Sequence, residues 1–425
     1  MRKTQRLVAW LTLAFAAVLP LVGIAAGASA QPSAQREQPA PIVILVSIDG
    51  FRADYFTTLH PPVLTRLAAS GVRSEGLVPQ FPSKTFPNHY TLVTGLRLPH
   101  HGIVSNNMVA PDIPGRFAMS RRDVIANPAW WGGEPIWNTV ERQGKIAAAM
   151  FWPGSETAIG GHQATYWMPF DDRMPGDARV AQVLDWLRLP EATRPSFLTL
   201  YFSDVDTAGH DFGPASAELR AAVQRVDGWI GALVAGVQAQ HLSQRVHYVI
   251  VSDHGMTAIP SDHFIRLDDF VNLATVDVID WAPVLGVTPL DGDAERLYAQ
   301  LADKHPALHV YRNRDIPARY GLAGHPRVPP VIGIADEGWY VTSTREQASW
   351  RSSDGPRTPA GTHGYDPSLP SMHGLFIATG PQVHRGLTAP RFENIDVYDF
   401  LCALLGVTPA PNDGTANVTR TFLRH

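Results

Sequence analysis

The chain has 425 residues, of which 45% are hydrophobic and 17% charged, and its formal net charge at pH 7 is −4. This length and hydrophobic content suffice to bury a large core, which excludes a disordered chain. The slight negative charge and the lack of a basic stripe exclude a general affinity for polyanions, so we expect no specific nucleic-acid partner. The single cysteine, Cys402, excludes an intramolecular disulfide, and its apolar sequence neighbours predict that it is buried.

The first thirty residues have the pattern of an export signal. A basic start precedes an apolar run over residues 7–26, and Ala28-Ser29-Ala30 supplies the small residues of a cleavage site. The alternative is an uncleaved membrane anchor, because the run approaches the length that spans a bilayer. Proline and glycine within the run favour cleavage. We therefore predict a signal peptide over residues 1–30 and a flexible leader over residues 31–40. The mature protein would be periplasmic or secreted, of bacterial type, with no stable membrane association.

Continuous apolar, β-branched runs predict strands that are buried on both faces, and helical patterns lie between them. The predicted strands are residues 42–48, 146–151, 197–202, 246–251 and 375–378, and the predicted helices are residues 62–69, 135–143, 178–187 and 217–237. This alternation predicts a single α/β domain over residues 41–425, with a mostly parallel central sheet sandwiched by helices.

The character of the sequence changes over residues 262–344. Three short strand-like pieces, at residues 276–279, 284–287 and 309–312, surround one helical pattern at residues 293–304. We predict a small inserted α+β subdomain here rather than an independent domain.

Aspartate and histidine follow several of the predicted strands directly. In open α/β sheets, sites form beyond the carboxyl ends of strands, so we expect these side chains to converge. Each alone is compatible with a turn or a helix cap. Together they form a ligand set suited to zinc, with manganese or iron also possible. Gly209 lies between two of these residues, Asp206 and His210, and it favours a turn over a helix there. The set consists of Asp49, Asp206, His210, Asp253, His254 and His363.

Thr85 is the candidate nucleophile. Pro87 fits the first turn of a helix that ends before Gly95. A hydroxyl at a helix start lies among free backbone N–H groups, which suits phosphate. The alternative is that Thr85 only caps the helix. A bound zinc ion favours the nucleophile, because it can hold the hydroxyl as an alkoxide. Catalysis by Ser, His and Asp is a weaker alternative, since no G-x-S-x-G elbow surrounds a suitable serine.

At these residues the sequence resembles the nucleotide pyrophosphatase/phosphodiesterase family of the alkaline phosphatase superfamily. The matching segments occur in order along nearly the whole chain after residue 40. They are residues 47–52, 84–89, 101–106, 131–137, 151–155, 206–210, 252–256 and 363–364. The resemblance implies an alkaline-phosphatase-like fold in a bacterial-type, single-domain member whose catalytic domain covers residues 41–425.

The resemblance also implies two zinc ions per chain. One would bind Asp206, His210 and His363, and the other would bind Asp49, Asp253 and His254, with Thr85 as its oxygen ligand. Thr85 would attack phosphorus in line, the opposite zinc would stabilise the leaving alkoxide, and water would then cleave a threonyl-phosphate intermediate.

For the substrate, the resemblance implies that Asn106 donates to a non-bridging phosphate oxygen and that Phe86 stacks on a nucleobase. Phe170, or in second place Tyr166, would supply the opposing aromatic face, and Met119 would line the same pocket. His373 is predicted not to be a ligand.

The implied activity is zinc-dependent hydrolysis of nucleotide phosphodiester and pyrophosphate bonds, which releases nucleoside 5'-monophosphates from a small-molecule substrate. One alternative is another superfamily activity: phosphomonoesterase, or hydrolase of phosphonates or of lysophospholipid or choline phosphodiesters. A catalytically inactive zinc- or ligand-binding homologue is a second alternative. The presence of Thr85 and of all six ligands disfavours the inactive homologue. The sequence predicts no particular oligomeric state.

Overall fold

The computed structural model describes residues 40–352, 355–356 and 358–424. The predicted signal peptide, and the predicted leader apart from Ala40, lie outside the described residues. Among the described helices, none combines the length and the apolar character needed to cross a bilayer.

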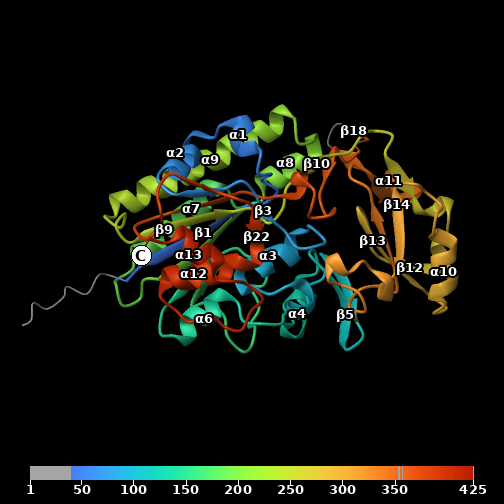
Figure 1. Cartoon of the computed structure of the whole chain (residues 1–425), viewed down its shortest axis with the longest axis horizontal. Helices are drawn as coiled ribbons and strands as arrows, with labels where there is room; N and C mark the ends of the chain where they lie inside the picture. The colour runs from blue at the N-terminus through green and yellow to red at the C-terminus, as the bar shows by residue number, and fades with distance from the viewer. Residues whose placement is uncertain (1–39, 353–354, 357, 425) are drawn as a thin grey trace, which may run out of the picture. The chain divides into compact units, whose positions relative to one another are not determined.

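An eight-stranded sheet occupies the centre of the fold (Figure 1), and its strands follow the order β21-β2-β20-β9-β1-β8-β6-β7. Strands β9, β1, β8, β6 and β7 are parallel to one another, whereas β20 runs antiparallel to both of its neighbours. The prediction of a mostly parallel sheet is therefore confirmed. The strands, in sheet order, are Leu387–Ala389, Val72–Ser74, Phe376–Thr379, Val246–Val251, Ile42–Ile48, Phe197–Phe202, Ala147–Met150 and Tyr166–Trp167.

Alternate residues of β1 pack on opposite faces of the sheet, as the two-residue period of a strand requires. Ile44 and Val46 join one buried cluster with the helices α2 (Pro62–Ala69), α7 (Gly176–Leu187) and α9 (Ala217–Ala239). Each large aliphatic side chain buried in this way contributes about 1.5–3 kcal/mol. The seven residues of β1 are all buried, which explains why this strand was predicted with its correct bounds.

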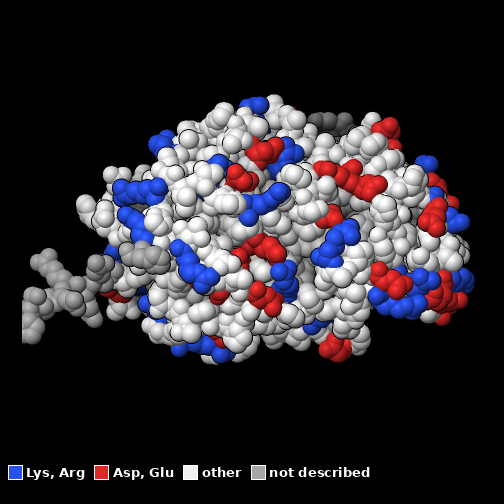
Figure 2. Space-filling model, viewed as in Figure 1, with Lys and Arg blue, Asp and Glu red and all other residues white. Residues whose placement is uncertain are grey.

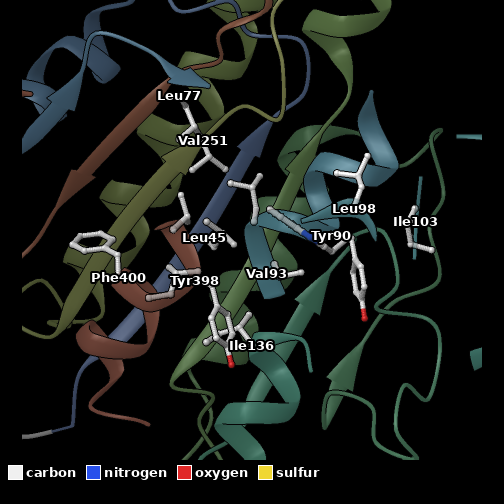
Figure 3. Packing of buried hydrophobic residues seen from close by; sticks show 14 of the residues in the cluster. Leu45, Leu77, Tyr90, Val93, Leu98, Ile103, Ile136, Val251, Tyr398 and Phe400 are labelled. Atoms are coloured by element: carbon white, nitrogen blue, oxygen red, sulfur yellow. The ribbon is translucent and has the colours of Figure 1, made fainter. Parts of the chain in front are cut away.

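The other face carries Leu45, which joins a second buried cluster with α3 (Thr85–Thr94), α6 (Ile136–Arg142) and α12 (Val397–Leu405). Figure 3 shows part of this cluster, in which Val93 and Phe400 point into the same interior as Leu45. Cys402 lies in this cluster, and burial raises the pKa of its thiol to about 12. The predicted burial of Cys402 is confirmed.

A second, smaller sheet forms within residues 262–344. Its four antiparallel strands follow the order β12 (Val276–Asp280), β13 (Val284–Pro289), β15 (Val331–Ala335) and β14 (Leu308–Arg312). Helix α10 (Ala294–Leu301) packs on this sheet and shares a separate buried cluster with it. Sequence analysis did not identify β15. We refer to this unit as the inserted subdomain.

Acidic and basic side chains lie interspersed over the face of the molecule shown in Figure 2. Because opposite charges cancel at short range, this face offers a polyanion little net attraction. Among the described residues, exposed arginines often pair with carboxylates, as Arg312 does with Glu295 and Arg97 with Glu393.

Candidate active site

Three neighbouring parallel strands bring the predicted ligands to one edge of the central sheet. Asp49 follows β1, Asp253 and His254 follow β9, and α8 (Asp204–Phe212) begins just after β8. The chain turns sharply after Asp49 because Gly50 has a φ of +66°. A Cβ on Gly50 would lie 2.8 Å from the Asp206 Cα atom, so the turn after β1 and the first turn of α8 meet closely.

The first candidate metal group consists of Asp206, His210 and His363. Asp206 Oδ1 lies 3.5 Å from His210 Nε2 and 3.6 Å from His363 Nε2. His363 reaches the group from the short strand β19 (Gly361–Thr362). Asp206 and His210 lie in one segment of the chain and His363 in another, because His210 and Gly361 are 151 residues apart in the sequence.

The second candidate metal group consists of Asp49, Asp253 and His254, all of them buried. His254 Nε2 lies 2.9 Å from Asp253 Oδ2 and 3.4 Å from Asp49 Oδ1. Tyr201 Oη donates a hydrogen bond of 2.6 Å to the other oxygen of Asp49. One oxygen of Asp49 is therefore held by the protein, and the other faces His254.

Each group contains buried carboxylate oxygens that lack a hydrogen-bond partner within the protein. These atoms are Asp49 Oδ1, Asp206 Oδ1 and Asp253 Oδ2. An unpaired buried charge is costly unless it coordinates a metal or is neutralised. Each of the three oxygens faces a histidine Nε2 of its own group, so the residues fit a bound cation in both groups.

All three histidines turn their Nε2 atoms towards the carboxylates, because their Nδ1 atoms donate to backbone carbonyl oxygens. The acceptors are Gly361 O for His210 at 2.9 Å, Ser83 O for His363 at 2.8 Å and Gly255 O for His254 at 2.9 Å. A carbonyl oxygen only accepts, so Nδ1 carries a proton, and in the neutral imidazole the Nε2 lone pair faces the carboxylates. This is the usual orientation of a metal-ligating histidine.

The protein alone leaves these groups in electrostatic conflict. Burial, together with the nearby Asp253 and Asp206 carboxylates, raises the pKa of Asp49 well above its usual value. Burial, together with neighbouring imidazoles, lowers the pKa of His363 well below its usual value. Divalent cations would favour both the ionised carboxylate and the neutral imidazole. Nitrogen and oxygen ligands in groups of three suit zinc among the common metals.

The predicted turn at Gly209 is wrong, because α8 continues through it and places Asp206 and His210 on one helical face. The glycine is needed for close packing rather than for a turn. A Cβ on Gly209 would lie 2.8 Å from Met256 Cε, and a Cβ on Gly361 would lie 2.5 Å from the Gly209 carbonyl oxygen. Close approach of β19 to α8 brings His363 to the first group.

Thr85 lies at the start of α3, as predicted, and its side chain faces the second group. Its Oγ1 atom is 3.3 Å from His254 Nε2, and only 8% of the residue is exposed. The alternative that Thr85 caps α3 is wrong. Lys84 is the N-cap residue, and its side chain makes no capping bond to the first turn of α3.

Asn106 lies beside the residue that follows Thr85. Its Oδ1 atom accepts a hydrogen bond of 2.9 Å from the backbone N–H of Phe86. Because this bond occupies the carbonyl end of the amide, Nδ2 is the end that can donate to a ligand. The structure therefore places Asn106 and Thr85 together, although they lie in different segments.

A cavity of about 290 Å³ adjoins the second group and reaches Thr85 and Asp49. Its size is near the lower end for small-molecule pockets. A larger cavity, of about 640 Å³, lies elsewhere and contains none of the six candidate ligands. Chemistry rather than size therefore identifies the candidate site. The aromatic and apolar residues that line the smaller cavity include Phe86, Met119, Trp131, Trp152 and Phe170.

Phe170 rather than Tyr166 takes part in this cavity. Tyr166 packs its ring on Trp186 and donates its hydroxyl to Thr193 O, and it does not line the cavity. The placement of Tyr166 in the pocket is therefore wrong, because β7 directs it towards α7. His373 lines the larger cavity and donates to Pro367 O, in keeping with its predicted exclusion from the ligands.

Sequence analysis missed two charged residues that support Phe170. Arg122 and Glu156 form an ion pair of 2.5 Å, and the backbone N–H of Phe170 donates to Glu156 Oε1 at 3.1 Å. The Arg122 guanidinium also lies 5.7 Å from the centre of the Phe170 ring. These contacts join three separate segments, one of them the short helix α5 (Arg122–Ile125), and no local pattern in the sequence signals them. Tyr201, which orients Asp49, was missed for the same reason.

Known proteins resemble this chain over most of its length. The family described as type I phosphodiesterase / nucleotide pyrophosphatase matches residues 43–366. Over 94% of its length the chain is 36% identical to a venom phosphodiesterase of Crotalus durissus collilineatus, of which it covers 48%. Over 91% of its length it is 34% identical to human ectonucleotide pyrophosphatase/phosphodiesterase family member 1, of which it covers 42%. The chain thus spans about half the length of these curated relatives.

Solved structures agree with the sequence relatives. Murine ectonucleotide pyrophosphatase/phosphodiesterase 5 superposes with a TM-score of 0.84 at 33% identity, covering 90% of this chain and 100% of its own. An inactive variant of that murine protein, with threonine replaced by alanine and AMP bound, gives a TM-score of 0.85 at 32% identity with the same coverage. The chain belongs to the type I phosphodiesterase / nucleotide pyrophosphatase family.

Proposed function

We propose that this protein hydrolyses nucleotide phosphodiester and pyrophosphate bonds at a two-zinc centre and releases nucleoside 5'-monophosphates. The observation that carries the proposal is the position of Thr85. Its hydroxyl lies 3.3 Å from His254 Nε2, and the residue lines a cavity together with aromatic side chains. A nucleophile, a metal group and a place for a nucleobase are thus adjacent. The AMP bound to the inactive murine variant supports a nucleotide substrate.

The proposed reaction has two displacements at phosphorus. Thr85 gives up its hydroxyl proton and its oxygen attacks in line, so that the bond from Thr85 to phosphorus forms while the bond to the leaving oxygen, which takes up a proton, breaks. Water then attacks phosphorus, the bond from Thr85 to phosphorus breaks, Thr85 regains its proton and the nucleoside monophosphate is released. Zinc bound by the two groups would supply Lewis acidity that lowers the pKa of the Thr85 hydroxyl and offsets the charge of the leaving oxygen.

The remaining contributions come from residues around Thr85. Asn106 Nδ2 donates to a non-bridging phosphate oxygen, since Oδ1 is occupied by the Phe86 N–H. Phe86, Phe170 and Met119 line the cavity, and a nucleobase in the cavity stacks on the two aromatic rings. Stacking of a base on an aromatic side chain contributes about 1–3 kcal/mol in single-stranded nucleic-acid sites.

We also propose that the catalytic domain covers residues 41–425, with the inserted subdomain within it, and that residues 1–30 direct export to the periplasm or the exterior. The basic start, the apolar run and Ala28-Ser29-Ala30 support export. Mass measurement of the secreted protein would give the cleavage position. Protein that retains residues 1–30 in a membrane fraction would contradict the proposal of a cleaved export signal.

A panel of substrates tests the proposed activity. ATP, a dinucleotide and a p-nitrophenyl nucleotide ester should be hydrolysed faster than p-nitrophenyl phosphate or a choline phosphodiester. Faster turnover of p-nitrophenyl phosphate would indicate a phosphomonoesterase, and faster turnover of the choline ester a lipid-type diesterase. No turnover of any member by zinc-loaded protein would indicate an inactive homologue.

A further inference from the structure

Asp280 is a buried carboxylate at the end of β12, in the inserted subdomain, and it accepts hydrogen bonds on both oxygens. Oδ2 accepts from Lys84 Nζ at 2.5 Å and from the Ser105 hydroxyl. Oδ1 accepts from Asn107 Nδ2 and from the Trp281 backbone N–H, each at 3.1 Å. Only 7% of Asp280 is exposed. The carboxylate is therefore fully paired, and its three side-chain partners, Lys84, Ser105 and Asn107, lie far from it in the sequence.

The partners of Asp280 flank the two residues that act at phosphorus in the proposed reaction. Lys84 directly precedes Thr85 and is the N-cap residue of α3. Ser105 and Asn107 lie on either side of Asn106. The Phe86 N–H donates to Asn106 Oδ1, so a direct hydrogen bond also links the segment of Thr85 to the segment of Asn106. Asp280 thus holds both segments from one side, while the Phe86–Asn106 bond holds them from the other.

Lys84 is itself buried, with 4% of the residue exposed, and its charge is matched by Asp280. A buried ion pair of this kind adds little net stability compared with apolar packing. It does fix geometry, because each partner loses much if it moves away from the other. The pairing also means that Lys84 is not a free cation for phosphate, so its role is to hold the start of α3.

We infer that Asp280 is a positioning residue for the proposed reaction: it sets the distance between the Thr85 nucleophile and the Asn106 donor. Asp280 touches neither the substrate site nor the candidate ligands, so it acts through Lys84, Ser105 and Asn107. The inserted subdomain is in this view part of the machinery that aligns phosphate, rather than an appendage. This inference rests on the proposed function.

The test uses Asp280→Asn, which keeps the shape of the side chain and removes its charge. We expect the variant to retain two zinc ions and to lose on the order of 10²-fold in kcat/KM for a nucleotide diester, mainly in kcat, because small misplacement of reacting groups is costly. Asp277→Asn is the matched control. Asp277 lies on the same strand in an ion pair with Arg116, is about two-fifths exposed, and contacts none of the residues around Thr85.

A double-mutant cycle separates positioning from stability. In the wild-type background, Asn106→Ala should lower kcat/KM strongly. In the Asp280→Asn background it should cost much less, because the amide is already misaligned. If Asp280→Asn fails to fold, Ser105→Ala replaces it in the cycle, since it removes one hydrogen bond and no charge; the expected loss is then about tenfold.

Three results would overturn the inference alone: an active Asp280→Asn variant, a loss fully explained by missing zinc, or losses at Asp280 and Asn106 that multiply independently. Wild-type protein that hydrolyses no diester would overturn the proposed function and the inference with it. The two failures are therefore distinguishable, because only the second concerns the wild-type rate.

Discussion

The imidazole rings of His254 and His363 are stacked face to face, with ring centroids 3.5 Å apart and planes inclined by 10°. The two residues belong to different candidate metal groups. Two imidazolium rings in this contact would repel each other, whereas neutral rings stack well and leave both Nε2 lone pairs for metal. The stack therefore brings the two candidate metal groups side by side, as a binuclear centre would require.

From this arrangement we predict that the purified protein contains close to two zinc ions per chain. Bound cations would compensate the three buried carboxylate oxygens that accept no hydrogen bond in the described structure. Elemental analysis measures the metal directly. Chelation should abolish nucleotide hydrolysis, and added zinc should restore it. Full activity in metal-stripped protein would rule out a two-metal site. Recovery with manganese or iron but not with zinc would show that the site uses one of those metals instead of zinc.

Replacing His363 by Ala should remove one zinc ion and most of the activity, because its Nε2 completes the first group. The control is His373→Ala, which changes a buried histidine outside both groups. That variant should keep two zinc ions and near-normal turnover. Metal content and rate measured on the same samples check both statements. Equal effects of the two substitutions would contradict the role of His363 as a metal ligand.

The aromatic cavity predicts a selective effect on nucleotide substrates. Phe86→Ala and Phe170→Ala should each lower kcat/KM for nucleotide esters more than for a simple aryl diester, because only the nucleotide has a base to stack. Tyr166→Ala is the matched aromatic control, since its ring packs on Trp186 outside the cavity. Rates with the two substrate types for each variant check this, and an equal loss on both substrates would mean that the aromatic residues only stabilise the fold.

The charge of the loaded site predicts a preference for diesters over monoesters. Two zinc ions would bring four positive charges, which the three aspartates and the Thr85 alkoxide would cancel. A diester then adds one negative charge and a monoester adds two, the second poorly compensated in a partly dehydrated site. Lys84 and Arg122 are no help, because each is paired with a carboxylate. Hence kcat/KM should be higher for a nucleotide diester than for p-nitrophenyl phosphate, and Asn106→Ala should lower all diester rates. The reverse order of rates would place the protein among phosphatases.

Local patterns predicted much of the fold and most of the ligand set. Strands β1, β8 and β9 were identified with their observed bounds, because each is a continuous apolar run that is buried on both faces. The aspartates and histidines that follow them could be recognised because adjacent parallel strands end at one edge of a sheet. The direction of a strand in the sheet could not be predicted in the same way, because the apolar pattern of β20 does not show that it runs antiparallel to β9.

Features that depend on contacts between distant segments could not be predicted. Gly209 reads as a helix breaker, but its role is set by Met256 and β19, which pack against it. Tyr166 lies on a two-residue strand whose existence depends on pairing with β6. Asp280 is 196 residues from its partner Lys84, and nothing in the sequence around either residue indicates the ion pair.

The proposed reaction depends on Thr85 as its nucleophile, so the turnover of a nucleotide diester by zinc-loaded Thr85→Ala protein tests it. Loss of the attacking oxygen should lower kcat by several orders of magnitude while the fold and both zinc ions are retained, as expected when a nucleophile is removed. Thr85→Ser, which keeps a hydroxyl, should retain measurable activity. Normal turnover by the alanine variant would contradict the account.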